Sequence, residues 1–240
     1  MYTLAERSCH RPAPRVGKLQ QSEGRQILNG AVRRKTDIMI ELIRPILDRP
    51  FFYELHNTLI GAKHRSLVLV RDYVRPKPGD HILDIGCGPG NMVPYLESTE
   101  YQGVDMNAEY IARARQRFGD QAKFSCQRVS EHTVHELGEF DIVLALGLVH
   151  HLDDSEADDL FRLGYAALKP GGRMITMDGC YLPKQSKLER YLLDSDRGRF
   201  VRTEENYVSL AQKRFSQVTP HLQPELLRIP YTHLFLVCTR

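Results

Sequence analysis

Between residues 81 and 178 the chain alternates short apolar runs with stretches of helical spacing, and this alternation constrains the fold more than any other feature. Five runs are typical of buried strands, at residues 81–85, 101–105, 122–127, 140–146 and 173–178, and the clearest helical stretches are 108–118 and 155–168. Strands that alternate with helices predict an α/β fold, a doubly wound parallel sheet covered on both faces. Two more strand-like runs, 215–221 and 232–239, have no helical pattern between them. We therefore expect the last two strands to be antiparallel.

The first 75 residues differ from this pattern. Residues 1–35 carry eight basic and two acidic side chains, although the chain of 240 residues has a net charge of only +3. Residues 1–25 also hold few large apolar side chains, so we predict a flexible basic arm there. Apolar residues at intervals of three and four predict two or three amphipathic helices in residues 26–75, ending before Pro76. Residues 76–240 then form the main domain.

Composition argues against several classes of protein. The nearly balanced charge disfavours a strong field for polyanions. The longest apolar run, residues 142–149, is far shorter than the roughly 20 residues of a membrane span. Five scattered cysteines without a C-x-x-C pair argue against a disulfide framework and a zinc site. We expect a cytoplasmic protein that does not enter a membrane.

The first predicted strand ends in a glycine loop, residues 86–90, which reads Gly-Cys-Gly-Pro-Gly and opens a helix. Glycines permit positive φ and the close approach of a ligand, and a helix N-terminus offers unpaired N–H groups. The loop lacks the third glycine of a dinucleotide fingerprint, because Asn91 stands there, and it lacks the Gly-Lys-Ser/Thr of a phosphate loop. We expect it to cradle another polar ligand.

Two carboxylates flank this loop. Asp105 ends the second predicted strand, beside the loop in a doubly wound sheet, where it can accept hydrogen bonds from both hydroxyls of a ribose. Asp84 precedes the loop, close to where an amino-acid or positively charged part of the same ligand would lie. Together they predict a nucleoside ligand.

The chain carries four motifs between about residues 77 and 178, namely residues 83–90, 103–106, 140–145 with 149–152, and 168–173. In sequence, order and spacing they resemble the class I S-adenosylmethionine-dependent methyltransferases, in particular their small-molecule branch. The resemblance implies a seven-stranded, Rossmann-like sheet with an antiparallel final pair and an N-terminal helical extension. It also implies S-adenosylmethionine as cofactor and S-adenosylhomocysteine as product.

The resemblance further implies which residues touch the cofactor. Met106 is expected to pack on the adenine, and backbone at Ala145 and Leu146 to touch the methionine portion. Relatives often carry an aspartate that meets the adenine amino group, but Arg128 stands there and offers only donors, which leaves Gln127, the backbone or Val129. The expected cofactor residues are Asp84, Gly86, Cys87, Gly88, Gly90, Asp105, Met106, Gln127, Val129, Ala145 and Leu146.

His150 and His151 follow the fourth predicted strand, at the carboxyl edge where ligands of such sheets bind. A hydroxyl or protonated amine acceptor needs a base, and histidine suits that task near neutral pH. Neighbouring residues point different ways, so one at most should face the substrate; that both histidines only close the pocket stays an open alternative. A metal site with Asp153 and Asp154 is disfavoured, because acidic residues before a helix usually cap it.

The acceptor side is less sharply defined. The apolar residues 146–151 lack the motifs of nucleic-acid methyltransferases and suit a small organic acceptor, such as a secondary metabolite, a quinone-like aromatic or a lipid precursor. Aromatic and charged residues in 179–203 suit a lid or an ordinary surface connection. In relatives the leading helices commonly cover the acceptor. The expected substrate contacts are therefore Tyr53, His56, Tyr181 and Tyr191.

These expectations describe a methyltransferase of natural-product or lipid-precursor chemistry. Two alternatives stay open: an RNA methyltransferase that docks through the basic arm, and a non-catalytic nucleoside-binding subunit. The lack of a base-modifying motif argues against a nucleic-acid partner, and the intact glycine loop argues against loss of the cofactor site. The basic arm could also reach a neighbouring subunit in a homo-oligomer.

Overall fold

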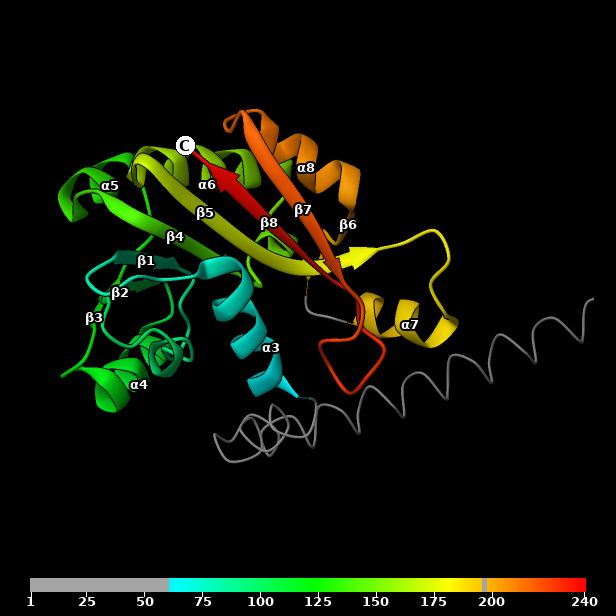
Figure 1. Ribbon diagram of the computed structural model, residues 1–240, viewed down its shortest axis with the longest axis horizontal. Helices are drawn as coiled ribbons and strands as arrows, with labels where there is room; N and C mark the ends of the chain where they lie inside the picture. The colour runs from blue at the N-terminus through cyan, green and yellow to red at the C-terminus, as the bar shows by residue number, and fades with distance from the viewer. Residues whose placement is uncertain (1–60, 196–197) are drawn as a thin grey trace, which may run out of the picture. The chain divides into compact units, whose positions relative to one another are not determined.

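The computed structural model describes residues 61–195 and 198–240, which belong to one compact unit of the chain (Figure 1). The predicted basic arm, the helices predicted within residues 26–60, and Tyr53 and His56 lie outside the described residues. The described part begins with α3 (Ala62–Val68), which continues as the π-helical η1 (Leu69–Val74). Arg75 then adopts a φ of 44° before Pro76, which ends the helix.

A mixed sheet forms the centre of this unit. Its strands are β1 (His81–Ile85), β2 (Glu100–Asp105), β3 (Lys123–Cys126), β4 (Phe140–Leu146), β5 (Leu168–Tyr181), β6 (Arg202–Thr203), β7 (Gln217–Gln223) and β8 (His233–Thr239). Seven of them follow the order β3-β2-β1-β4-β5-β8-β7, and β6 pairs with β5 off this path. The first five strands are parallel, and β8 is antiparallel to both β5 and β7. The predicted sheet with its antiparallel final pair is confirmed, and the two-residue β6 is additional.

Helices cover both faces of the sheet (Figure 1). One core contains side chains from α5 (Glu131–Leu137), α6 (Asp154–Ala167) and α8 (Glu204–Gln212). The other contains side chains from α3, η1, η2 (Val93–Tyr95) and α4 (Ala108–Phe118). None of the helices in the described ranges is long and apolar enough to cross a membrane.

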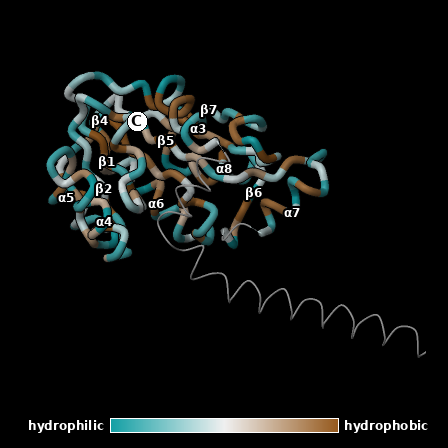
Figure 2. The backbone as a smooth tube through the Cα atoms, turned by 90° about the horizontal axis from the view of Figure 1, so that it is seen from below, coloured by the Kyte–Doolittle hydropathy of each residue, from teal (hydrophilic) through white to brown (hydrophobic). Residues whose placement is uncertain are grey.

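Side chains of the central strands alternate between the two cores. In β1, Leu83 and Ile85 pack toward α6, whereas Ile82 packs toward α4. In β4, Val143 packs toward α6 and Ile142 packs toward α4. This period of two buries both faces of each strand, and Figure 2 accordingly shows β1 and β4 as apolar segments. Strands buried on both faces read as continuous apolar runs, which is why the sequence pattern located them.

The segment 179–203 contains more regular structure than the sequence pattern predicted. β5 continues to Tyr181 instead of ending at Asp178, and it is followed by α7 (Lys187–Ser195) and then by β6. β6 pairs Arg202 with Cys180 in parallel. The chain after α7 therefore returns to the carboxyl end of β5, beside the turn that follows β4.

Candidate active site

The glycine loop follows β1 and runs beside the end of β2. Gly86, Gly88 and Gly90 have φ angles of 75°, 54° and 76°, a left-handed conformation that favours glycine. The amides of Gly86 and Cys87 donate to the carbonyl of Val104 at 2.8 and 3.2 Å, which holds the loop against β2. A Cβ atom added at Gly88 would meet nothing within 4 Å, whereas one at Gly90 would press on two phenylalanine rings. The loop is therefore open at Gly88 and packed at Gly90.

Asp105 ends β2 directly beside this loop. Its Oδ2 accepts a hydrogen bond from the amide of Gly88 at 2.9 Å, and its Oδ1 accepts one from the amide of Asn107 at 2.8 Å. A carboxylate has about four acceptor positions, so both oxygens keep capacity for a ligand. The next side chain, Met106, is 70% exposed. The end of β2 thus offers acceptors and an apolar surface side by side.

Asp84 lies inside the protein, below the loop. Its side chain is 2% exposed, and its Oδ2 accepts a hydrogen bond from the hydroxyl of Tyr101 at 2.6 Å. Burial raises the pKa of Asp84 to about 7; the Tyr101 hydrogen bond lowers it, and the charge of Asp105 raises it. Asp84 is therefore partly protonated near neutral pH and ties β1 to β2 where the loop begins.

The other expected cofactor residues lie at or near the same edge of the sheet. Two are buried and two are half-buried: Cys87 and Ala145, then Val129 and Leu146. The amide of Gln127 donates to the carbonyl of Asp105 at 3.1 Å, so the chain leaving β3 meets the end of β2. The guanidinium of Arg128 lies 4.0 Å from the carboxylate of Glu156 in α6. Arg128 thus pairs with a helix.

A buried pair joins the ends of β4 and β5. After β4 the chain turns through η3 (Val149–His151), and His150 is 6% exposed. Its Nδ1 lies 2.8 Å from Oδ1 of Asp178, and its amide donates to the same oxygen at 3.1 Å. One carboxylate therefore fixes both the ring and the backbone of His150. We did not predict Asp178; the signal that could have found it is a carboxylate near the carboxyl end of a strand, the same signal that identified Asp105.

A second histidine, His233, is buried at this edge, where β8 pairs it with Gly179 of β5. Burial, followed by the charges of Arg65 and His150, lowers the pKa of His233 to about 3. His233 is therefore neutral at physiological pH. Its ring lies 4.8 Å from that of Tyr231, centroid to centroid.

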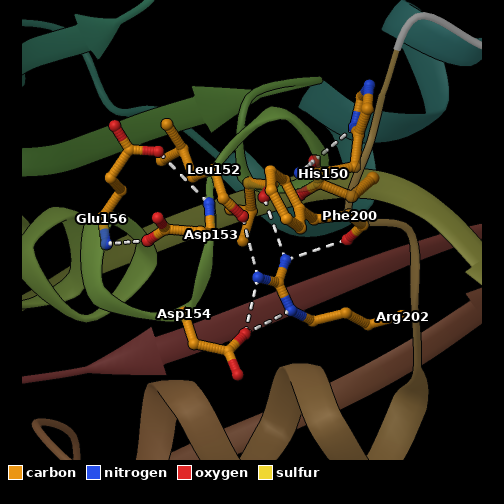
Figure 3. A network of polar contacts seen from close by, with 9 residues as sticks. His150, Leu152, Asp153, Asp154, Glu156, Phe200 and Arg202 are labelled. Carbon is orange, nitrogen blue, oxygen red and sulfur yellow. Dashed lines mark hydrogen bonds and ion pairs between the residues drawn. The ribbon is translucent and has the colours of Figure 1, made fainter.

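Of the two acidic residues after His151, Asp153 caps α6, as predicted. Oδ1 of Asp153 accepts from the amide of Glu156 at 2.9 Å, and the Glu156 carboxylate accepts from the amide of Asp153 at 3.2 Å (Figure 3). Asp154 pairs instead with Arg202 at 2.7 Å. Within residues 61–195 and 198–240, no three His, Cys, Asp or Glu side chains are grouped as metal ligands.

The expected acceptor residues are less closely gathered. His151 is exposed, with its ring centroid 4.2 Å from that of His150. The hydroxyl of Tyr181 donates to Asp194 of α7 at 2.7 Å, and Arg190 lies over the Tyr181 ring at 3.8 Å. Tyr191, also on α7, is 67% exposed. The contacts of Tyr181 thus hold α7 in place.

Residues 82–172 match a family model described as a methyltransferase domain. The match runs from β1 into the beginning of β5. It includes the glycine loop, Asp105 and His150, which carry the geometry described above. It ends before Asp178 and before the whole segment 179–203.

Two curated relatives show the degree of sequence similarity. Phosphoethanolamine N-methyltransferase 2 of Caenorhabditis elegans is 28% identical over 164 residues, which cover 64% of this chain and 36% of that protein. Ubiquinone biosynthesis O-methyltransferase of Sodalis glossinidius is 31% identical over 120 residues, which cover 46% of this chain and 47% of that protein. The chain spans less than half the length of either relative.

A solved structure of phosphoethanolamine N-methyltransferase 2 from Haemonchus contortus, in complex with phosphomonomethylethanolamine and S-adenosylhomocysteine, has the same fold. It aligns with a TM-score of 0.61 at 16% identity and covers 81% of this chain and 59% of that chain. Family model, sequence relatives and fold agree. Residues 82–172 are similar to a methyltransferase domain, and the described part of the chain has the fold of a solved methyltransferase.

Proposed function

We propose that this chain binds S-adenosylmethionine at the carboxyl edge of the sheet and transfers its methyl group to a small organic acceptor. The observation that carries the proposal is the contact between the open glycine loop and Asp105. The amide of Gly88 meets the carboxylate of Asp105 at 2.9 Å, so backbone and charge converge at one point of the sheet edge. A nucleoside needs both of these elements.

The residues at this edge of the sheet fit the cofactor. A side chain at Gly88 would project into open space, so the glycine leaves room for a ligand. Asp105 would accept hydrogen bonds from the two ribose hydroxyls, and exposed Met106 would pack on the adenine. Asp84 lies beneath the loop, and it would be close to the amino-acid portion of the bound cofactor.

When bound, the cofactor supplies a methyl group on a positively charged sulfur, and that charge disappears on transfer. The protein mainly has to align the acceptor with the methyl group and exclude water. A hydroxyl or ammonium acceptor must also lose a proton. In the tautomer whose Nδ1–H donates to Oδ1 of Asp178, the lone pair of the His150 imidazole lies on Nε2. Nε2 would take the acceptor proton, and Asp178 would stabilise the imidazolium that results.

Of the two histidines, His150 is the better base. Asp178 bonds to both its ring and its amide, which fixes the direction of the imidazole. His151 is exposed and would serve the acceptor pocket by packing against the His150 ring. Contacts of Tyr53, His56, Tyr181 and Tyr191 with the acceptor belong to the same proposal.

The relatives support a small acceptor without selecting one. Their names indicate phosphoethanolamine, a precursor of ubiquinone and, for a probable methyltransferase of Mycobacterium tuberculosis, a fatty acid. The first two names specify methylation at nitrogen and at oxygen. The proposal therefore covers the acceptor class and leaves the methylated atom to experiment.

Two measurements test this function. Calorimetry should detect binding of S-adenosylhomocysteine, and Asp105→Asn should weaken it by about 1–3 kcal/mol because charge-assisted hydrogen bonds are lost. Asp120→Asn, at an exposed position, should bind as the wild type does. Incubation with a donor carrying a labelled methyl group should then label one of three probes: phosphoethanolamine, a catechol or a fatty acid. No binding by the wild type, or label on added RNA alone, would contradict the proposal.

A further inference from the structure

Arg202 reaches the turn that carries His150 from the segment after α7 (Figure 3). Arg202 is 8% exposed, an uncommon position for an arginine. We propose that Arg202 is a positioning residue, which holds this turn in the shape that keeps His150 on Asp178. The inference rests on the role proposed for His150 in methyl transfer.

Each N–H group of the Arg202 guanidinium has an acceptor. Nη1 donates to the carbonyls of Val149 at 3.1 Å and Phe200 at 2.9 Å, and Nη2 donates to the carbonyl of Leu152 at 2.8 Å. Nε and Nη2 also donate to Oδ1 of Asp154 at 3.0 and 2.7 Å. A guanidinium has five N–H donors in one rigid plane, and all five are used. Val149 and Leu152 stand on either side of the two histidines, so this plane fixes both ends of the turn.

The segment before Arg202 packs against His150 itself. The amide of Phe200 donates to the carbonyl of His150 at 2.9 Å. Gly198 lies so close to the imidazole that an added Cβ atom would be 2.0 Å from Cδ2 of His150. The imidazole is therefore held by Asp178 and bordered by this segment. Arg202 fixes the segment through the carbonyl of Phe200, and β6 anchors Arg202 two residues beyond Asp178 by pairing it with Cys180.

The contacts of Arg202 are not required to begin α6. The capping box of Asp153 and Glu156 already satisfies two amides at the start of that helix, those of Asp153 and Glu156. Asp154 has a side chain that is 79% exposed, so water can solvate its carboxylate without the pair. Three of the five contacts go to main-chain carbonyls of the turn and the adjoining segment. The role that remains for Arg202 is to hold the turn around His150 in its observed shape.

Four substitutions separate this role from a merely structural one. Arg202→Met removes every hydrogen bond of the guanidinium, and Arg202→Lys keeps the charge but offers three donors on one nitrogen, which cannot serve four separate acceptors. Asp154→Asn leaves the three carbonyl contacts in place. Arg214→Met is the matched control, because Arg214 makes a similar pair with Asp158 of the same helix, at 2.7 Å, away from the turn.

The main readout is the imidazole of His150, observed by ¹⁵N NMR and assigned with His150→Gln. In the wild type we expect the Nδ1–H tautomer with a slowly exchanging proton. Both Arg202 variants should lose this signature, whereas Asp154→Asn and Arg214→Met should keep it. Turnover with the labelled donor should fall roughly 10²-fold in the Arg202 variants, with affinity for S-adenosylhomocysteine unchanged within about twofold.

A wild-type His150 spectrum in the Arg202 variants would overturn the inference, as would an equal change in Arg214→Met or Asp154→Asn. If Arg202→Met does not fold, Arg202→Lys and Gly198→Ala decide; the alanine presses on the imidazole without touching Arg202, and an undisturbed spectrum in both would count against the proposal. The NMR readout needs neither cofactor nor acceptor. A wild type that binds no S-adenosylhomocysteine would therefore contradict the proposed function alone.

Discussion

At the scale of single residues, Asp84 links the glycine loop to the stability of the sheet. In the folded chain burial raises its pKa to about 7 from an ordinary value of 3.8. The folded state therefore holds the proton more tightly than the unfolded state does. The stability that results is fully present below about pH 4 and is lost as the pH rises through about 7.

We expect Asp84→Asn to reduce this pH dependence. The asparagine keeps an acceptor for the Tyr101 hydroxyl but has no proton to lose. Between about pH 5 and 8 the wild type should lose roughly 2–3 kcal/mol more of its free energy of unfolding than the variant does. Urea unfolding at a series of pH values measures this, with Asp120→Asn as an exposed control. Parallel profiles for wild type and Asp84→Asn would show that the buried carboxyl does not titrate in this range.

Gly88 offers a second test at this scale, because the effect of its backbone conformation on stability can be measured separately from its effect on ligand binding. A Cβ atom would meet nothing within 4 Å at Gly88 or at Gly79, which stands at the opposite end of β1, and both have positive φ. Alanine at either position should cost about 1–2 kcal/mol of stability. Only Gly88→Ala should also weaken binding of S-adenosylhomocysteine, roughly tenfold or more, since its methyl group enters the space proposed for the ligand. Equal affinities in calorimetry would place the ligand elsewhere.

At the scale of elements, Tyr181 provides one of the attachments of α7 to β5, beside the buried Leu193, which packs on Gly179. The Tyr181 hydroxyl donates to Asp194, and Arg190 covers the ring. Tyr181→Phe removes the hydrogen bond and keeps the ring, so we expect amide hydrogen exchange in α7 to become roughly fivefold faster, the equivalent of about 1 kcal/mol. Tyr191→Phe, which removes an exposed hydroxyl from the same helix, should leave exchange unchanged. Unaltered protection of α7 in Tyr181→Phe would argue that the helix is held by other contacts.

How far the elements could be predicted depends on how local their causes are. β1 and β4 begin and end where the apolar pattern predicts, because both faces of each strand are buried. α7 was not predicted, since two of its apolar side chains, Leu188 and Tyr191, remain exposed and blur its amphipathic pattern. β6 was missed because two residues show no period.

The residues of the candidate site also differ in how far the sequence could predict them. The glycine loop and Asp105 could be predicted, because a short motif fixes the loop and the end of the neighbouring strand fixes the carboxylate. The partner of His150 is Asp178, 28 residues away, and only the pairing of β4 with β5 brings them together. From the sequence alone, Arg202 would be interpreted as an exposed charged residue. Acceptors some 50 residues earlier in the chain are what allow it to be buried.

At the scale of the whole molecule, the distribution of charge separates a small acceptor from a polynucleotide. Residues 1–25 contain five basic and two acidic side chains, a balance of +3, and the whole chain is also +3. Residues 26–240 therefore have no net charge. A polyanion would be attracted mainly through the first 25 residues. Every residue assigned to the cofactor, by contrast, lies between Asp84 and Leu146.

Deletion of residues 1–25 should consequently leave the affinity for S-adenosylhomocysteine and the turnover of a small acceptor unchanged within about twofold, because it removes charge and no proposed cofactor contact. Binding of single-stranded RNA, followed by fluorescence anisotropy at low salt, should fall sharply in the same variant. A full-length chain whose five basic residues in the arm are changed to glutamine is the matched control, since it keeps the length and loses the charge. If both variants lost methyl transfer together with RNA binding, the basic arm would be guiding the true acceptor, and that acceptor would be a nucleic acid.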